Sequence, residues 1–176
     1  FMNAKLFQIG DLRGLLRSKL NNMTQKSFIK LALLITKRFR MLVNGFDIDG
    51  VIHLGDKKCG IRPGPGDVII TGRSYEEEEE TISFLRRNGI CNTVFFNQVQ
   101  YEEKTRESSG WHKGQTILML HRAGLNIEYF FEDDEVQKEQ IENILKEKDS
   151  WKLLTKVVHV HNPWVPKENR RHLEDV

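Results

Sequence analysis

The stretch MLVNGFDIDGV, residues 41–51, decides the fold and locates a candidate site. It begins with an apolar run typical of a buried strand, and two acids, Asp47 and Asp49, follow directly. Side chains at positions i and i+2 of a strand share a face, roughly 6.5 Å apart, so both carboxylates should point to one place. Two carboxylates that close repel each other unless a cation or a shared proton lies between them. The stretch therefore predicts a bound divalent metal, although acidic, glycine-containing turns are also common where no metal binds.

Short apolar runs alternate with helical stretches from Met41 onward, a pattern typical of βαβ units that build a parallel sheet. We expect strands at residues 42–47, 67–71, 93–96, 127–131 and 156–160. Helices are expected at residues 74–88, with Ser74 as the cap and Gly89 as the stop, at 111–123 before Gly124, and at 135–148. The predicted fold class is therefore α/β, with a Rossmann-like parallel sheet of about five strands and flanking helices.

The composition limits the chain to a few protein classes. With 176 residues it is long enough for one well-buried domain. Its two cysteines, Cys59 and Cys91, lie far apart without zinc-site spacing, which favours a reducing, cytoplasmic setting, and Cys91 is expected to be buried. No apolar run approaches the roughly 20 residues that span a bilayer, so we expect no membrane span. The oligomeric state does not follow from these features.

Positive charge is concentrated at the start of the chain. Residues 1–41 hold nine lysines and arginines and one acid, whereas residues 42–176 hold 18 basic and 24 acidic residues. We expect a basic helical hairpin over residues 1–40, as an N-terminal extension of the main domain over residues 41–176. The hairpin could bind nucleic acid or another anionic surface, and docking on the chain's own acidic domain is an equally simple alternative.

Polar residues follow several predicted strands, at the edge where ligands bind in open parallel sheets. Asp47 and Asp49 follow the first strand, Thr71-Gly72-Arg73 follows the second, and Glu132-Asp133-Asp134 follows the fourth. Lys113 lies in a stretch that is expected to open a helix, from where its amine could reach the same edge. Acids, a hydroxyl and a cation are therefore expected to come together from separate segments.

Each of these residue types suits the hydrolysis of a phosphate ester. The Asp47 carboxylate can attack phosphorus as a nucleophile, and Asp49 can act as general acid and general base. Hydroxyl, backbone N–H, guanidinium and ammonium groups can hold phosphoryl oxygens and offset their charge. The predicted substrate-binding residues are Thr71, Gly72, Arg73 and Lys113, of which Thr71 and Lys113 are also assigned to catalysis. Arg73 could instead begin a helix as a surface charge.

Magnesium is the expected cofactor, because it prefers hard oxygen ligands such as carboxylates. The predicted ligands are Asp47 and Asp49, completed by Asp133 or Asp134. Glu132 could also belong to the metal site, but alternation along the strand should turn it away from Asp133.

Three histidines near these segments could bind substrate or metal, but each has a simpler interpretation. His53 could touch the substrate, although a solvent-facing loop histidine is the simpler interpretation. His159 and His161 share a strand face and could bind a metal, but no third ligand is in view, which favours a structural role.

In their order along the chain, these motifs resemble those of the haloacid-dehalogenase-like (HAD) phosphohydrolase superfamily. Asp47-x-Asp49-Gly50-Val51 resembles the first motif, Thr71-Gly72-Arg73 the second, Lys113 the third and Asp133-Asp134 the fourth, within about residues 42–162. The resemblance implies a Rossmann-like sheet, an aspartyl-phosphate intermediate and Mg²⁺, with residues 41–176 as the catalytic domain. Lys104 is a conceivable substitute for Lys113.

The predicted site has little room for a cap domain. The gap from Asp49 to Thr71 is short and contains Pro63-Gly64-Pro65-Gly66, and residues 97–110 are polar and expected to form a loop. HAD-like enzymes with a minimal cap or none usually act on large substrates or use a partner as a lid. The resemblance therefore implies a phosphorylated substrate such as a nucleotide, a polynucleotide end or a phosphoprotein. Residues 97–109 also resemble loops of small nucleotidase-like members.

An alternative class of function uses the same fold differently. A nucleic-acid-binding or scaffolding protein could keep the HAD-like fold and use the basic residues 1–40 as its working surface. Salt-dependent binding to DNA or RNA that disappears when residues 1–40 are deleted, and that Asp47→Asn leaves unchanged, would favour this alternative.

Overall fold

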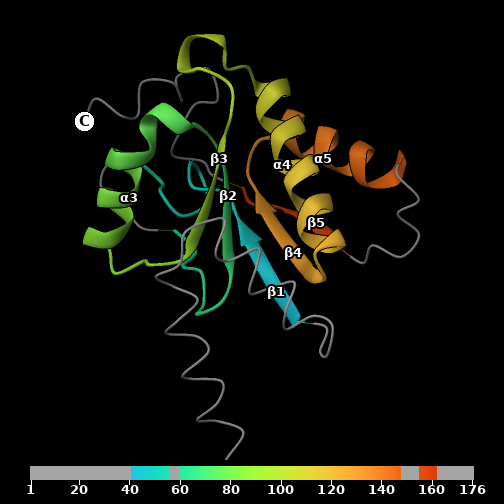
Figure 1. Ribbon diagram of the computed structural model, residues 1–176, viewed down its shortest axis with the longest axis horizontal. Helices are drawn as coiled ribbons and strands as arrows, with labels where there is room; N and C mark the ends of the chain where they lie inside the picture. Colours follow the sequence, from blue (N-terminus) through green and yellow to red (C-terminus); the bar gives the residue numbers. More distant parts are fainter. Residues whose placement is uncertain (1–40, 56–59, 148–154, 162–176) are drawn as a thin grey trace, which may run out of the picture.

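A sheet of five parallel strands forms the centre of the structure (Figure 1). This computed structural model describes residues 41–55, 60–147 and 155–161, and the hairpin predicted over residues 1–40 lies outside them. The strands are β1 (Met41–Phe46), β2 (Val68–Ser74), β3 (Thr93–Asn97), β4 (Leu125–Glu132) and β5 (Lys156–His159). Their order in the sheet is β3-β2-β1-β4-β5, and every neighbouring pair is parallel.

Helices cover both faces of this sheet. They are α3 (Glu78–Arg87), α4 (Arg106–Arg122) and α5 (Glu135–Glu147), with the short 3₁₀ helices η1 (Tyr75–Glu77) and η2 (Tyr101–Glu103). α3 lies on one face, whereas α4 and α5 pack together on the other (Figure 1). The prediction of an α/β fold with a five-stranded, Rossmann-like parallel sheet and flanking helices is therefore confirmed.

Two apolar clusters hold the layers together. Successive side chains of a strand point to opposite faces, so Ile70 joins the cluster under α4 and α5, whereas Ile69 joins the cluster on the α3 side. A glycine allows α4 and α5 to approach closely, because a Cβ at Gly114 would lie 2.8 Å from the Ile144 side chain. The central strands are therefore apolar on both faces, as is usual for parallel sheets.

The order of the strands reverses its direction beside β1. From β1 the chain continues to β2 and β3 on one side, and it then returns to β4 and β5 on the other side. In open α/β sheets, ligands bind outside the carboxyl ends of the strands at such a reversal. The residues that follow β1 and β4 are therefore the first place to look for a site.

The largest error in the predicted elements concerns α4, which begins at Arg106 rather than at Trp111. Thr105 caps this helix, since its hydroxyl accepts the backbone N–H of Ser108 at 3.0 Å. Residues 106–110, predicted as a loop, are polar or glycine and therefore show no apolar periodicity that would indicate a helix. Lys113 consequently lies about two turns inside α4 and not at its opening.

Smaller differences affect β2 and Cys91. β2 continues past its predicted end to Ser74, so Thr71-Gly72-Arg73 lies within the strand rather than after it. Ser74 then caps η1 in a capping box, which confirms its predicted role as a cap. Cys91 is exposed rather than buried.

The segment between β1 and β2 contains turns and an isolated bridge between Asp49 and His53, and its described residues include no helix.

None of the helices in the described part of the chain has the length and apolar character that a membrane crossing requires.

Candidate active site

Lys113 joins two buried carboxylates at the carboxyl ends of β1 and β4. Its Nζ atom lies 2.7 Å from Asp47 Oδ2 and 2.6 Å from Glu132 Oε2, and its side chain is fully buried. A buried charge is tolerated when partners of opposite charge offset it, as the two carboxylates do here. The other candidate, Lys104, pairs instead with Glu77 Oε2 at 2.7 Å. Of the two lysines, Lys113 is therefore the one that the fold brings to Asp47.

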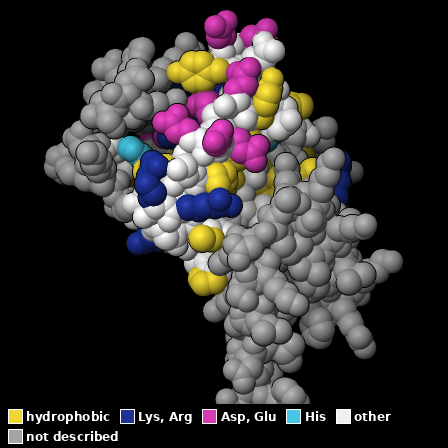
Figure 2. Space-filling view, turned by 60° about the vertical axis from the view of Figure 1, so that its left-hand side comes forward, with side chains coloured by type: hydrophobic (Ala, Val, Ile, Leu, Met, Phe, Trp, Pro, Cys, Tyr) yellow, Lys and Arg dark blue, Asp and Glu magenta, His cyan; other side chains and the backbone are white. Residues whose placement is uncertain are grey.

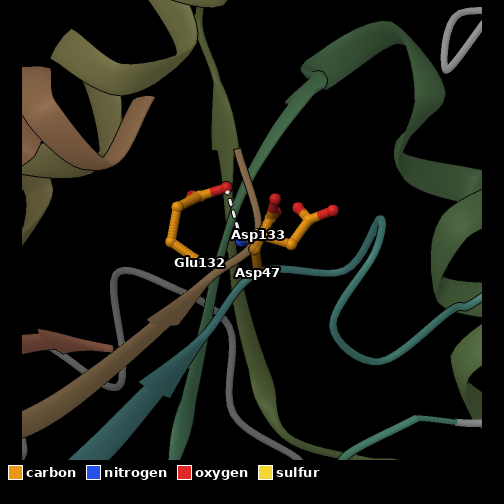
Figure 3. A group of neighbouring side chains, drawn as sticks. All are labelled: Asp47, Glu132 and Asp133. Carbon is orange, nitrogen blue, oxygen red and sulfur yellow. Dashed lines mark hydrogen bonds between the residues drawn. The ribbon is translucent and has the colours of Figure 1, made fainter. Parts of the chain in front are cut away.

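Asp47, Glu132 and Asp133 form an acidic cluster that could hold a metal ion (Figure 3). Each offers one carboxylate oxygen, these oxygens lie within 4.8 Å of one another, and all three residues are buried. Oxygen donors of this kind suit hard divalent cations. Gly50, with a φ of +79°, makes room for the cluster, because a Cβ there would collide with the Asp133 carboxylate. The donor set of the acidic cluster therefore fits a divalent metal ion.

Burial governs the charge of the acidic cluster. Burial raises the pKa of Asp47, and Lys113 counteracts this effect only in part. Burial also raises the pKa of Glu132, again with Lys113 opposing the shift. Burial alone would lower the pKa of Lys113, but the two carboxylates outweigh it, so the pKa is raised and the amine stays charged. The three carboxylates of the acidic cluster thus carry more negative charge than the Lys113 ammonium offsets. A shared proton or a metal ion can neutralise the excess.

Arg73 holds Asp49 in a two-point ion pair. Its Nε donates to Asp49 Oδ2 at 2.9 Å and its Nη2 to Oδ1 at 2.6 Å, while its Nη1 donates to the Thr81 hydroxyl at 3.1 Å. Arg73 is 8% exposed, which excludes the alternative of a surface charge that begins a helix. Burial raises the pKa of Asp49, but the ion pair with Arg73 outweighs it and holds that pKa at about 2. The Asp49 side chain is therefore an ionised carboxylate outside the acidic cluster.

Asp134 caps the N-terminus of α5. Its Oδ1 accepts the backbone N–H groups of Val136 and Gln137 at 2.8 and 3.1 Å, which is the pattern of a helix N-cap. Arg106, in the first turn of α4, donates to both of its carboxylate oxygens at 2.7 Å. The Asp134 side chain thus links two helices, and the structure brings Asp133 rather than Asp134 to the acidic cluster.

Thr71 and Gly72 lie near the carboxyl end of β2, the strand next to β1. Thr71 is fully buried, and its hydroxyl accepts the backbone N–H of Arg73 at 3.2 Å. A Cβ at Gly72 would lie 2.8 Å from the Ser109 hydroxyl of α4, so only a glycine fits without displacing that helix. This part of β2 therefore lies at the same edge of the sheet as Asp47.

The histidines have structural contacts. The His53 ring packs against Phe84 with 4.9 Å between ring centroids, and its Nδ1 accepts the Gly55 backbone N–H at 3.2 Å. Burial lowers the pKa of His53. His159 Nε2 lies 3.0 Å from the Asp133 carbonyl oxygen, and the group in the described residues that could hold a metal contains neither His159 nor His161.

Glu132 is the residue whose placement sequence reasoning missed. Alternation along β4 was expected to turn it away from Asp133, yet its Oε1 accepts the Asp133 backbone N–H at 3.1 Å and its carboxylate joins the acidic cluster. The expectation was wrong because the chain leaves the regular strand geometry immediately after Glu132. A glutamate at the end of the aromatic run Tyr129-Phe130-Phe131 was the available signal, since burying a carboxylate requires partners.

The Asp49–Arg73 pair predicts a pH-dependent contribution to stability. The pKa of Asp49 is about 2 in the folded protein, below the ordinary value of 3.8. A carboxyl group with a depressed pKa stabilises the fold above its ordinary pKa, and this contribution is lost as the pH falls through the folded value. We expect Asp49→Asn to lower the free energy of unfolding at pH 6 by up to about 2 kcal/mol, and the difference from wild type to shrink below pH 4.

Urea unfolding without divalent metal, at several pH values between 2 and 7, measures this difference. A loss of stability of the same size at pH 6 and at pH 2 would contradict the assigned ion pair.

An acidic surface adjoins the segment that follows Arg73. Figure 2 shows acidic side chains gathered at one end of the face that carries α3. The exposed glutamates of these elements are Glu76, Glu78, Glu79, Glu80, Glu102 and Glu103. Glu76 Oε2 accepts the Tyr101 backbone N–H at 2.8 Å, which ties η1 to η2. We call these six glutamates the acidic surface.

Comparison with known proteins identified no relative, so the function has to be inferred from the geometry of the site. No protein-family profile, no curated protein and no solved structure matches this chain.

Proposed function

We propose that this protein is a Mg²⁺-dependent phosphohydrolase with a HAD-like fold, which cleaves phosphate monoesters through an aspartyl phosphate on Asp47. The observation that supports this most is the position of the Lys113 amine between Asp47 and Glu132, with Asp133 in the same acidic cluster. The cluster lies at the carboxyl ends of β1 and β4, where the strand order reverses. The proposed nucleophile, a cation and potential metal ligands therefore lie together at this edge of the sheet.

In the first step, an Asp47 carboxylate oxygen attacks phosphorus, and the bond between phosphorus and the ester oxygen breaks. Asp49 supplies the proton that the leaving oxygen needs. While Arg73 binds it, Asp49 is ionised, so it can donate only after the ion pair opens and the carboxylate takes up a proton. Opening the pair also releases the Arg73 guanidinium to bind phosphoryl oxygens.

In the second step, water attacks the phosphorus of the aspartyl phosphate. Asp49 takes a proton from that water, the bond between phosphorus and Asp47 breaks, and inorganic phosphate leaves. An ionised Asp49 is the form that this step requires as a base. Asp47 is thereby freed as a carboxylate, and Asp49 holds a proton that it can donate to the next leaving group or release to solvent when the ion pair with Arg73 forms again.

The remaining residues bind and neutralise charge. Lys113 offsets the charge of Asp47 before the reaction and of the phosphoryl group during it. The Thr71 hydroxyl and the backbone at Gly72 are the proposed partners of phosphoryl oxygens, as their position near the end of β2 allows. These groups need no proton transfer, since they act through fixed dipoles and charge.

Asp47 and Asp133 are the residues that would hold Mg²⁺. The side chains of Asp49 and Asp134 are engaged by Arg73 and Arg106, which makes them weaker candidates than the sequence alone indicates. When bound, Mg²⁺ supplies positive charge to the phosphoryl oxygens.

The acidic surface bears on the class of substrate. It includes Glu76 of η1, which begins two residues after Arg73, so a polynucleotide bound there would bring many phosphates close to exposed glutamates. Such like charges repel each other at ordinary ionic strength. We therefore favour a nucleotide, another small phosphate ester or a phosphoprotein over a polynucleotide end.

Removal of the metal should abolish turnover. Without divalent cations, we expect wild-type protein to release no phosphate from an aryl phosphate, and added Mg²⁺ to restore the rate. Asp133→Asn should raise the Mg²⁺ concentration for half-maximal rate at least about tenfold, because a neutral amide is a weaker ligand than a carboxylate.

Phosphate release measured against Mg²⁺ concentration tests both expectations. Glu128→Gln, which changes an exposed acid elsewhere on β4, is the matched control and should follow the wild-type curve. Full turnover in excess chelator would refute the dependence on a metal.

A further inference from the structure

Glu132 makes contacts in two directions from a fully buried position. Its Oε2 accepts a hydrogen bond from Lys113 Nζ at 2.6 Å. Its Oε1 accepts the backbone N–H groups of Asp133 and Asp134 at 3.1 and 3.0 Å, and Figure 3 shows the carboxylate turned back toward the Asp133 backbone. Protein groups therefore use both carboxylate oxygens.

These contacts argue against Glu132 as a metal ligand, although it belongs to the acidic cluster. Lys113 engages one oxygen of Glu132 and one of Asp47 alike, so the other oxygen of each carboxylate decides. Asp47 Oδ1 accepts one backbone N–H, from Ile48, and keeps a lone pair for a metal, whereas Glu132 Oε1 accepts two backbone N–H groups. A metal on Oε1 would compete with two backbone N–H groups, which would then lose their partner in a buried place.

Packing alone does not account for a glutamate at this position. The preceding residues of β4 are aromatic, and Phe130 is fully buried in the apolar core. A buried carboxylate destabilises a protein unless charged or polar partners compensate for its lost hydration. Glu132 has these partners in Lys113 and in the backbone of the Asp133-Asp134 turn.

We infer that Glu132 is a positioning residue, which holds the Lys113 amine against Asp47 and orients the backbone that carries Asp133. This inference rests on the proposed function insofar as Lys113 and Asp133 act in phosphoryl transfer. The flexible four-carbon side chain of Lys113 needs a second anchor to keep its amine at one place. Glu132 is that anchor, and it ties the cation to the same turn that carries the proposed metal ligand.

Glu132→Gln is the variant that tests this role. It keeps the shape and one oxygen for the backbone N–H groups, but it presents an amide where Lys113 now meets a carboxylate. We expect kcat to fall about 10- to 100-fold and KM to change less than about threefold, because misplaced catalytic groups affect the transition state most. Glu128→Gln on the same strand should keep wild-type kcat and KM.

A double-mutant cycle shows whether Glu132 acts through Lys113. In a Lys113→Met background the amine is absent, so Glu132→Gln should lower kcat by less than about threefold. A loss as large in that background as in the wild type would overturn the inference.

Magnesium binding without substrate distinguishes positioning from metal ligation. Titration calorimetry should show that Glu132→Gln binds Mg²⁺ at least about tenfold more tightly than Asp133→Asn does. If Glu132→Gln loses as much Mg²⁺ affinity as Asp133→Asn, Glu132 is a metal ligand and the inference is wrong.

The same cycle in urea unfolding separates this inference from the proposed function, because it needs no activity. Glu132→Gln and Lys113→Met should together destabilise the metal-free protein less than the sum of the single changes, since they remove one shared interaction. Additive effects would contradict the pairing of the two side chains. Wild-type protein that hydrolyses no phosphate ester with any divalent metal would instead refute the proposed function alone.

Discussion

Asp47→Asn is expected to lower the turnover of p-nitrophenyl phosphate with Mg²⁺ by at least about 10³-fold. The amide has the size of the carboxylate but cannot attack phosphorus, so the aspartyl phosphate does not form. An Asn oxygen can still accept the Ile48 backbone N–H, which Asp47 Oδ1 accepts at 2.7 Å, so the fold should persist. Steady-state rates measure the loss, and mass spectrometry of trapped protein should find phosphate on Asp47 of the wild type alone.

The matched control for this change is Asp67→Asn. Asp67 accepts the backbone N–H groups of Asn44 and Gly64 at 2.8 Å each, so its replacement removes structural hydrogen bonds without touching the acidic cluster. We expect lower stability but turnover within about threefold of wild type. Wild-type turnover by Asp47→Asn would show that another group is the nucleophile.

Lys113→Met is expected to lower kcat by about 10²- to 10³-fold, since it removes the cation that, in the proposed mechanism, offsets charge on the phosphoryl group and on Asp47. It also leaves Asp47 and Glu132 buried without their ammonium partner. Breaking a buried ion pair from one side commonly costs about 3–5 kcal/mol, part of which protonation of the two acids should recover. Kinetics together with urea unfolding separate the catalytic effect from the loss of stability.

Two other lysines serve as comparisons for Lys113. Lys138 forms a partly exposed ion pair with Glu142 on α5, and Lys138→Met should leave both kcat and stability near wild-type values. Lys104→Met tests the alternative assignment, and we expect its kcat to stay at least about tenfold above that of Lys113→Met, because Lys104 contacts Glu77 and not Asp47. The reverse ranking would move the catalytic role to Lys104.

Periodicity predicted the sheet well because buried parallel strands are short apolar runs between glycine-rich turns. All five strands occur near their predicted positions, and β2 shows the largest shift, ending at Ser74 instead of Thr71. The start of α4 was missed because a helix end set by a cap, here Thr105, need not carry an apolar stripe. Local hydrogen bonding, rather than hydrophobic pattern, decides such boundaries.

The sequence also predicted which segments meet, since the carboxyl ends of parallel strands share one edge of a sheet. Asp47, Lys113 and Asp133 do come together there. The partners of the neighbouring charged residues were not predictable, because ion pairs between distant segments depend on side-chain reach across the fold. Arg73 with Asp49 and Arg106 with Asp134 are pairs of this kind.

By itself, the sequence determined the α/β class and the strand positions, because both follow from the local pattern of apolar residues. It also determined the edge of the sheet at which acids, a hydroxyl and a lysine gather, because that edge follows from the direction of the strands. Only the tertiary structure decided which acids surround Lys113. Alternation along β4 pointed Glu132 away from Asp133, but its carboxylate meets Lys113 and the backbone of the following turn. The physical reason is burial: a carboxylate enclosed by apolar layers needs compensating partners, and where those partners lie depends on how α4 packs against the sheet.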